Sequence, residues 1–345
     1  MPPVPERVLV SGSSGFIGGY LCGELLRRGY QVVGVDNFSK YGPRHSPHEG
    51  NPDFAFVEGD AADVSLMTSL LTDCDHFIAA AAMVGGISYF HAYPYDLLAT
   101  NERIMAGSCD AAVTAFRQGR LRKLTYVSSS MVYEHADSWP SHEGQQATVP
   151  PPRSAYGFQK LAGEYFARAA FEQYELPFTI VRPFNCVGVG ESRALRAERV
   201  SSGDIKLALS HVVPDLVTKV LKGQDPLRIL GSGRQLRHYT YGGDLARGIV
   251  TAMEHPAARC EDFNLSTAAG TTVLQLAELI WIKIKGPGVP LRIAHDTPFR
   301  HDVERREPDT GKARRLLGFQ AQTSLGDVLD EVIGWIAGAA EAGLV

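Results

Sequence analysis

The 345-residue chain lacks any strong excess of charge and any long apolar run. Its 34 basic residues nearly balance its 38 acidic ones, so the net charge of −4 favours neither nucleic acid nor a membrane surface as a partner. The longest nearly apolar stretch, residues 77–87, is too short to cross a bilayer. The first residues show no signal-peptide pattern, so we expect a cytoplasmic protein.

Paired or clustered cysteines are also missing. None of the cysteine spacings is typical of a zinc site, and a chain of this length can bury a core without a disulfide framework. We therefore expect neither a metal centre nor a disulfide scaffold. The five cysteines are Cys22, Cys74, Cys109, Cys186 and Cys260.

Glycine, in contrast, is concentrated in one early turn. An apolar stretch runs into Gly12, and Gly15 and Gly18 follow in the pattern G-x-x-G-x-x-G, with Phe16 and Ile17 between the last two. Such glycines let the backbone turn tightly and approach a pyrophosphate, whose charge the N–H groups of the following helix can bind. The alternative is a glycine-rich turn without a ligand. The flanking strand and helix favour a dinucleotide site.

An acidic residue at the end of the next predicted strand extends this site. Asp36 lies roughly 20 residues beyond the glycine turn, and Asn37 follows it directly. A carboxylate there accepts hydrogen bonds from the adenosine ribose and repels a 2′-phosphate, so NAD is favoured over NADP. After the third predicted strand, Asp60 and Ala61 have two interpretations: contact with the adenine, or the start of a helix.

Short apolar segments alternate with amphipathic segments through the first half of the chain. This alternation predicts an α/β fold, a Rossmann-type doubly wound parallel sheet, with the ligand at the carboxyl ends of the strands. We assign residues 1–185 to an NAD-binding domain and 186–345 mainly to a smaller C-terminal α/β substrate lobe, with segments such as 239–270 as candidates for returning to the first domain. The polar stretch 191–206 is expected to be a loop or lid. The predicted strands are 7–11, 31–36, 54–58, 75–79, 123–128, 178–183, 227–230 and 291–293; the predicted helices are 18–28, 64–71, 97–118, 155–174, 213–222, 243–254, 273–284 and 324–337.

A tyrosine and a lysine lie four residues apart in one predicted helix. This spacing puts the phenol of Tyr156 and the ammonium of Lys160 on one face. A serine cluster, Ser128 to Ser130, precedes them. An exposed helical pair is the alternative, but the glycine turn and the serines in this order indicate an oxidoreductase-type site.

Taken in order along the chain, these motifs resemble the extended short-chain dehydrogenase/reductase family, the nucleotide-sugar epimerases and dehydratases. The resemblance covers essentially the whole chain and is more specific for the family than for the reaction. Besides the glycine turn it rests on Asp36, Gly59-Asp60, Ala81-Ala82, Asn101, 128–133, 156–160, 182–185, 212–214, 231–237 and 309–313.

The resemblance implies a catalytic trio. Tyr156 would act as the base that takes a sugar hydroxyl proton, and the charge of Lys160 would lower the pKa of that phenol. Ser129 would hydrogen-bond the same substrate oxygen. A serine-rich strand end without a role is the alternative for Ser129, and Ser128 or Ser130 could be the acting hydroxyl.

The resemblance also implies two sets of binding residues. The NAD set is Gly12, Gly15, Phe16, Ile17, Gly18, Asp36, Asn37, Asp60, Ala61, Ala81, Ala82, Asn101, Ser128, Tyr156 and Lys160. The substrate set is Ser129, Ser130, Met131, Asn185, Val212, Val213, Arg237 and Arg300, with Arg305 and Arg306 as alternatives to Arg300 for clamping a diphosphate.

The residue at position 131 bears on the reaction. In the family, dehydratases and decarboxylases carry a glutamate here and some 3,5-epimerases a cysteine, whereas Met131 cannot exchange a proton. Epimerisation at C4 needs no such group. The resemblance therefore favours an NAD-dependent C4 epimerase of a nucleoside-diphosphate hexose, with a UDP-sugar as the favoured substrate.

Several alternatives remain open. Glu134, Glu198, Lys206 or His211 could supply the proton-transfer group of an unusual dehydratase or C3/C5 epimerase. A 4-ketoreductase is a further alternative, and a non-catalytic NAD-binding regulator a remote one. The resemblance also implies a homodimer built on the predicted helices 97–118 and 155–174, whose alanines permit close packing.

Overall fold

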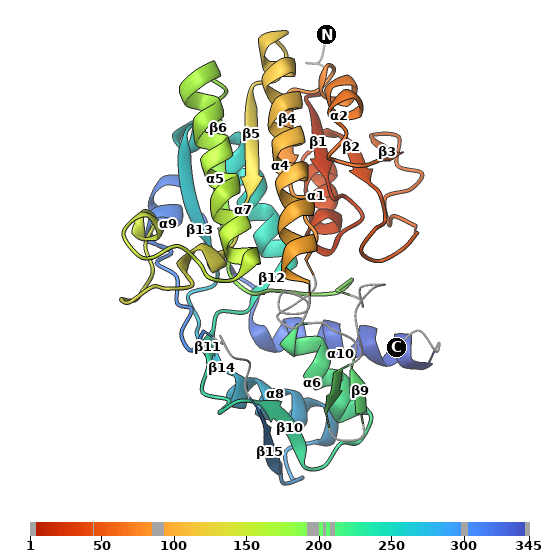
Figure 1. The fold of residues 1–345 in the computed structure, drawn as a ribbon. Coiled ribbons are helices and arrows are strands. Elements are labelled where there is room, and N and C mark those ends of the chain that lie inside the picture. The colour runs from red at the N-terminus through yellow and green to blue at the C-terminus, as the bar shows by residue number, and fades with distance from the viewer. Residues whose placement is uncertain are drawn as a thin grey trace.

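The computed structural model describes residues 5–43, 45–84, 93–191, 200–202, 205–207, 211–297 and 303–341. A seven-stranded parallel sheet forms its centre, in the order β13-β6-β5-β4-β1-β2-β3 (Figure 1). This order confirms the predicted Rossmann-type α/β fold. The strands are β1 (Arg7–Ser11), β2 (Gln31–Asp36), β3 (Phe54–Glu58), β4 (His76–Ala79), β5 (Lys123–Val127), β6 (Phe178–Pro183) and β13 (Glu261–Leu265).

Helices cover both faces of this sheet. On one face, α2 (Val64–Leu71), α4 (Pro94–Arg117) and α5 (Ala155–Tyr174) bury apolar side chains such as Met67 and Ala167 against the strands. On the other, α1 (Phe16–Arg27), α7 (Gly242–Glu254) and α9 (Gly311–Leu317) do the same. Since both faces are covered, the central strands β1, β4, β5 and β6 are almost wholly buried.

A smaller lobe lies beyond the carboxyl ends of the strands, at the bottom of Figure 1. It contains α6 (Val212–Leu221), α8 (Val273–Lys285) and α10 (Leu325–Glu341), with β10 (Leu227–Leu230) parallel to β15 (Ile293–Asp296). Its core is separate from the two beside the sheet and includes Val217, Ile280 and Val332. The smaller lobe also has two short antiparallel strand pairs: β11 (Leu236–Arg237) with β14 (Thr271–Thr272), and β8 (Val200–Ser202) with β9 (Ile205–Leu207).

The chain crosses between the two parts more than once. β7 (Cys186–Val187) pairs with β12 (Thr240–Tyr241), α7 packs on α1, and β13 adds the last strand to the large sheet beside β6. Much of the segment 239–270 thus lies with the sheet. Short 3-10 turns η1 (Ser130–Tyr133), η2 (Gln145–Ala147) and η3 (Pro256–Ala258) complete the elements.

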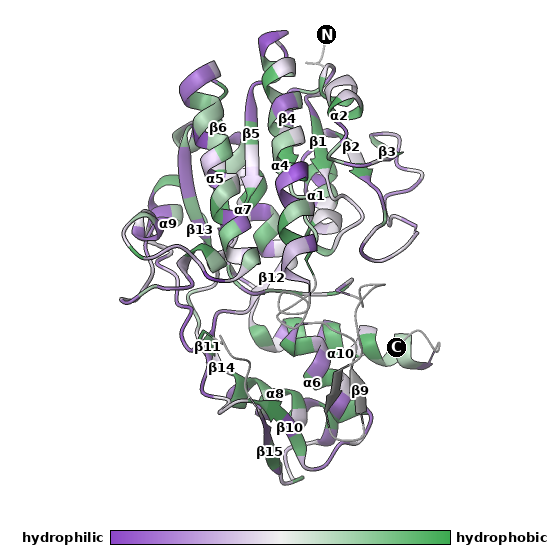
Figure 2. Cartoon of the chain, viewed as in Figure 1, coloured by the Kyte–Doolittle hydropathy of each residue, from purple (hydrophilic) through white to green (hydrophobic). Residues whose placement is uncertain are grey.

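Most predicted elements match the observed ones to within a few residues, but the sequence did not predict β13, α9 or the two- and three-residue strands β7, β8, β9, β11, β12 and β14. The sequence Glu261-Asp262-Phe263-Asn264-Leu265 is polar at three of its five positions, as Figure 2 shows for β13, so it carries no apolar signal. The seven-residue α9 is too short to show a helical period. The strand predicted over 291–293 begins at Ile293 instead, and the expected loop 191–206 includes β8 and part of β9, while 192–199 and 203–204 lie outside the described residues. Among the described residues, no helix is long and apolar enough to span a membrane.

Candidate active site

The glycine turn between β1 and α1 is so tight that its glycines have no room for side chains. A Cβ at Gly18 would lie 2.0 Å from the carbonyl oxygen of Gly12, and one at Gly12 would lie 2.9 Å from the Cα of Ala81. Gly12 also has a φ of +75°, which favours glycine. Gly15 caps α1 without a side-chain hydrogen bond, so the first N–H groups of the helix remain available for an anion.

Asp36 ends β2 beside this turn. One carboxylate oxygen accepts the backbone N–H of Ser14 (3.0 Å) and the other that of Phe38 (2.8 Å). These bonds hold the glycine turn against β2 and leave lone pairs for a further donor. The side chain therefore has a structural task that its position in the sequence did not reveal.

The next loops complete this end of the site. Asp60 accepts hydrogen bonds from the Asn37 side chain (3.1 Å) and from the backbone of Ala62 (2.9 Å). The helix N-cap that follows is Asp63, so the helix-start interpretation of Asp60 is wrong. Asn101 is buried and its side chain accepts from the N–H of Met83 (2.6 Å) and donates to its carbonyl (3.0 Å).

A cavity of about 750 Å³ runs along the carboxyl ends of the strands and continues into the smaller lobe. All but two of the predicted site residues line this cavity. Asn101 does not line it and instead holds the Met83 loop that does, and Arg300 lies outside the described residues. The predicted residues that line it are Gly12, Gly15, Phe16, Ile17, Gly18, Asp36, Asn37, Asp60, Ala61, Ala81, Ala82, Ser128, Ser129, Ser130, Met131, Tyr156, Lys160, Asn185, Val212, Val213 and Arg237.

The serine, tyrosine and lysine all line this cavity. Burial raises the pKa of the Tyr156 phenol, while a hydrogen bond with Ser129 and the charge of Arg306 lower it. Lys160, on the next turn of α5, donates to the Val127 carbonyl (2.8 Å). Burial lowers its pKa to about 8. The groups that lower the Tyr156 pKa are thus Ser129 and Arg306, where the sequence predicted Lys160.

The substrate half of the cavity is polar at defined points. Asn185 has a φ of +38°, and its buried Nδ2 has no hydrogen-bond partner among the described residues. Arg237 is buried and donates to the carbonyls of Leu236 (2.9 Å) and Glu304 (3.3 Å). Arg306 lines the cavity, whereas Arg305 pairs with Glu307 away from it.

Two residues that line the cavity, His211 and Glu191, can exchange a proton, and His211 is one of the four candidate proton-transfer groups of the sequence. His211 forms an ion pair with Glu191, which had no predicted role, and this carboxylate raises the His211 pKa. Glu134 is outside the cavity and accepts from Ser154 Oγ (2.5 Å) at the start of α5. Glu198 and the side chain of Lys206 lie outside the described part.

Known proteins with this architecture identify the family. A profile of the NAD dependent epimerase/dehydratase family matches residues 8–266. The chain belongs to this family. It is 27% identical to UDP-glucuronic acid decarboxylase 1 of Danio rerio over 96% of this chain and 73% of that protein, and 27% identical to the uncharacterized UDP-glucose epimerase YtcB of Bacillus subtilis over 96% and 98%. The solved UDP-glucuronic acid 4-epimerase of Bacillus cereus, in complex with UDP-glucuronic acid and NAD, superposes with a TM-score of 0.78 at 26% identity, covering 96% of this chain and 99% of that one.

The cofactor of this epimerase/dehydratase family, NAD, fits the residues present. The glycine turn lets a pyrophosphate approach the backbone where any Cβ would collide, and α1 offers uncapped N–H groups to it. Asp36, at the end of β2 beside this turn, would offer its carboxylate to the adenosine ribose. Within the described residues, no group of three or more histidine, cysteine, aspartate or glutamate side chains is arranged to hold a metal ion.

Proposed function

We propose that this member of the NAD dependent epimerase/dehydratase family inverts C4 of a nucleoside-diphosphate hexose through a transient 4-keto sugar. One arrangement carries the proposal. Ser129 and Tyr156 are hydrogen-bonded to each other, with Lys160 on the next turn, in the same cavity as the glycine turn and beside Met131, which cannot exchange a proton.

Oxidation of a C4 hydroxyl to a ketone removes one proton and one hydride. NAD, when bound, supplies the acceptor and later the donor of that hydride. Tyr156 takes the hydroxyl proton and returns it after the sugar has turned over, and Ser129 steadies the charge on the same oxygen. Ser129 and Arg306 favour the phenolate of Tyr156, and Lys160 lies buried on the next turn of the same helix.

The rest of the cavity suits the nucleotide of such a substrate. Arg237 and Arg306 present guanidinium groups that match phosphate oxygens, and the free amide nitrogen of Asn185 can donate to the same group. Val212 and Val213, at the start of α6, offer an apolar wall for the base. A UDP-sugar is the favoured substrate, in line with the UDP-sugars named for the relatives.

The Glu191–His211 pair favours one alternative. An imidazole held by a carboxylate in the same cavity can exchange a proton, which a dehydratase or a C3/C5 epimerase requires. A 4-ketoreductase would instead release oxidised cofactor and consume the reduced form.

A panel of UDP-, GDP-, dTDP- and CDP-sugars, incubated with the purified protein and analysed by mass and NMR, tests the proposal. A product of unchanged mass with C4 inverted, formed without added cofactor, is expected. A product lighter by water or carbon dioxide would contradict it and favour the His211 alternative. Turnover that requires supplied NADPH would indicate the ketoreductase.

We further propose the division into an NAD-binding domain over 1–185, joined by much of 239–270, and a substrate lobe in the remainder. α4 and α5 lie side by side on one face of the molecule (Figure 1) and expose Tyr95 (76%) and Tyr165 (65%), which supports a homodimer through these helices. Light scattering would test this state. We also propose a cytoplasmic location, which the five free thiols support.

A further inference from the structure

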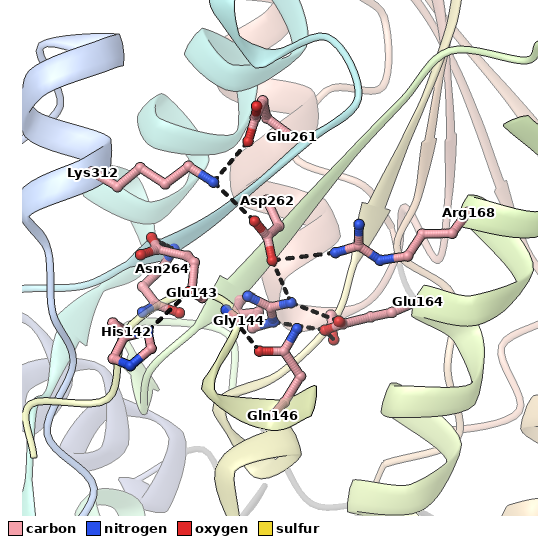
Figure 3. Close-up of polar contacts among 12 residues, drawn as sticks. His142, Glu143, Gly144, Gln146, Glu164, Arg168, Glu261, Asp262, Asn264 and Lys312 are labelled. Atoms are coloured by element: carbon pink, nitrogen blue, oxygen red, sulfur yellow. Dashed lines mark hydrogen bonds and ion pairs between the residues drawn. The ribbon is translucent and has the colours of Figure 1, made fainter. Parts of the chain in front are cut away.

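A buried charge network lies directly behind the candidate catalytic loop. Glu164 and Arg168 project from α5, and Asp262 and Lys312 face them from β13 and α9 (Figure 3). At the centre is Arg182 of β6, the largest side chain in the molecule's described part that is fully buried. None of these charged residues takes part in the proposed chemistry.

Glu164 connects the network to the catalytic loop. Its Oε1 accepts a hydrogen bond of 2.7 Å from the hydroxyl of Ser128, the residue before Ser129. Glu164 also lies one helical turn after Lys160, on the same face of α5. One carboxylate therefore bonds the residue that precedes Ser129 and lies one helical turn from Lys160.

Arg182 keeps this carboxylate in place. It binds Glu164 through two nitrogens, at 2.7 Å and 2.6 Å, and its Nη2 also bonds Asp262 at 2.7 Å. Its Nη1 donates to the hydroxyl of Tyr133 (2.9 Å), which ends η1. The loop that carries Ser129 is thus held at its beginning through Ser128 and at its end through Tyr133.

We propose that Glu164 is a positioning residue of the active site, whose fixed carboxylate orients the Ser128–Ser129 loop and supplies the counter-charge that keeps Lys160 protonated. The inference deepens the proposed function, since it concerns the same site. Arg182 acts behind Glu164 by holding its carboxylate.

The surroundings of Lys160 explain why a counter-charge is needed. Its side chain is 4% exposed, and burial disfavours the ammonium form. Glu164 is the charged group that opposes this effect. The other titratable groups nearby are Tyr156 on the same helix and Tyr126 of β5, whose ring lies 5.3 Å from Nζ, and Glu102 of α4 faces Tyr126.

The test is the pKa of Lys160, measured by NMR in NAD-saturated protein labelled at its lysines, without any nucleotide sugar. The Lys160 signal is assigned by its loss in Lys160→Arg. Glu164→Gln keeps the shape and the hydrogen-bond acceptor but removes the charge. We expect the Lys160 pKa to fall by about one pH unit or more below that of the wild-type protein.

Asp262→Asn is the matched control. Asp262 bonds the same nitrogen of Arg182 at nearly the same distance as Glu164, 2.7 Å against 2.6 Å, but it does not touch Ser128 or Lys160. This variant should lose stability and leave the Lys160 pKa unchanged. An unchanged pKa in Glu164→Gln, or an equal fall in both variants, would overturn the proposal.

A second variant covers the case in which Glu164→Gln fails to fold. Glu164→Gln combined with Arg182→Met removes both partners of the buried pair, which proteins tolerate better than loss of one. The Lys160 pKa should fall in this variant too, and a pKa equal to that of the wild-type protein would contradict the proposal. Because no substrate is present, failure of the epimerase proposal leaves this result interpretable.

Discussion

Tyr156 and Lys160 are both held in environments that disfavour their charged forms. Burial raises the pKa of the phenol and lowers that of the ammonium to about 8. The phenolate needed for proton abstraction is therefore favoured mainly by Ser129 and Arg306 on the Tyr156 side. Since Arg306 also lines the proposed diphosphate region, substrate binding and the state of the base are linked through one guanidinium.

Replacing Tyr156 by phenylalanine removes the proposed base and little else. We expect turnover of the responsive nucleotide sugar to fall by about 10²–10⁴-fold, while NAD affinity by calorimetry stays nearly unchanged. Tyr174→Phe, at the far end of the same helix and 37% exposed, is the matched control and should behave as the wild type. Retained turnover in Tyr156→Phe would remove the residue from the reaction.

Asp36 combines a structural and a binding task, and two substitutions separate them. Asp36→Asn keeps an acceptor for a backbone N–H but loses the charge, whereas Asp36→Ala loses both. We expect the preference for NAD over NADP to relax in both variants. NAD affinity should weaken by about tenfold or more, most in Asp36→Ala, because hydrogen bonds to a charged group contribute about 1.5–3 kcal/mol. An unchanged NAD/NADP ratio in titrations would exclude contact with the ribose.

Among the elements, α1 shows how closely backbone segments approach in the cofactor turn. Gly18 and Gly19 are adjacent in this helix, but their surroundings are opposite. A Cβ at Gly18 would meet the carbonyl of Gly12 at 2.0 Å, whereas at Gly19 it would meet nothing within 4 Å. The first glycine is required by packing, and the second only lowers helix stability.

The two glycines therefore provide a matched pair of substitutions. Gly18→Ala should destabilise the protein by about 1–3 kcal/mol and abolish NAD binding, because the turn must open. Gly19→Ala should be neutral or stabilising by up to about 1 kcal/mol. Urea unfolding and NAD titration measure both effects. Equal stability of the two variants would show that the turn adapts freely.

For the whole molecule, the Arg182 network joins elements far apart in the chain. Glu164 on α5, Arg182 on β6, Asp262 on β13 and Lys312 on α9 meet in one cluster. β13 is the outermost strand beside β6, so this cluster fastens the edge of the sheet to the helices on both sides. The stability of this edge should depend on the charge of Asp262.

The pH dependence of unfolding tests this link. Burial alone would raise the Asp262 pKa, but Arg182 and Lys312 outweigh it and lower the pKa from 3.8 to about 2. Because the folded pKa is the lower one, the contribution is complete above about pH 4 and is lost as the pH falls through 2. It amounts to about 2 kcal/mol. In Asp262→Asn the decline in unfolding free energy over this window should be smaller by that amount, and an identical decline would contradict the assignment.

The parts of the site that could be predicted are those whose interacting residues lie close together in the sequence. The glycine turn and the Tyr156/Lys160 pair depend on neighbours within one turn or one helix, so their spacing is visible in the sequence. Arg306 was one of three arginines that the sequence offered for binding a diphosphate, and only the fold brings its charge close to Tyr156. Glu191 had no signal, because its partner His211 lies 20 positions away across a polar stretch.

Local sequence patterns predicted the alternation of strands and helices along the chain, the cofactor turn and the Tyr156/Lys160 pair, since each pattern spans only a few residues. The resemblance to the family then selected Ser129. The tertiary structure decided which distant residues share a cavity and which charges are buried together. β13 entered the sheet without an apolar pattern, because its Asp262 is neutralised by Arg182, 80 positions earlier. Such pairing depends on which strands and helices the fold brings together, and no hydrophobic period within a short segment of the sequence encodes it.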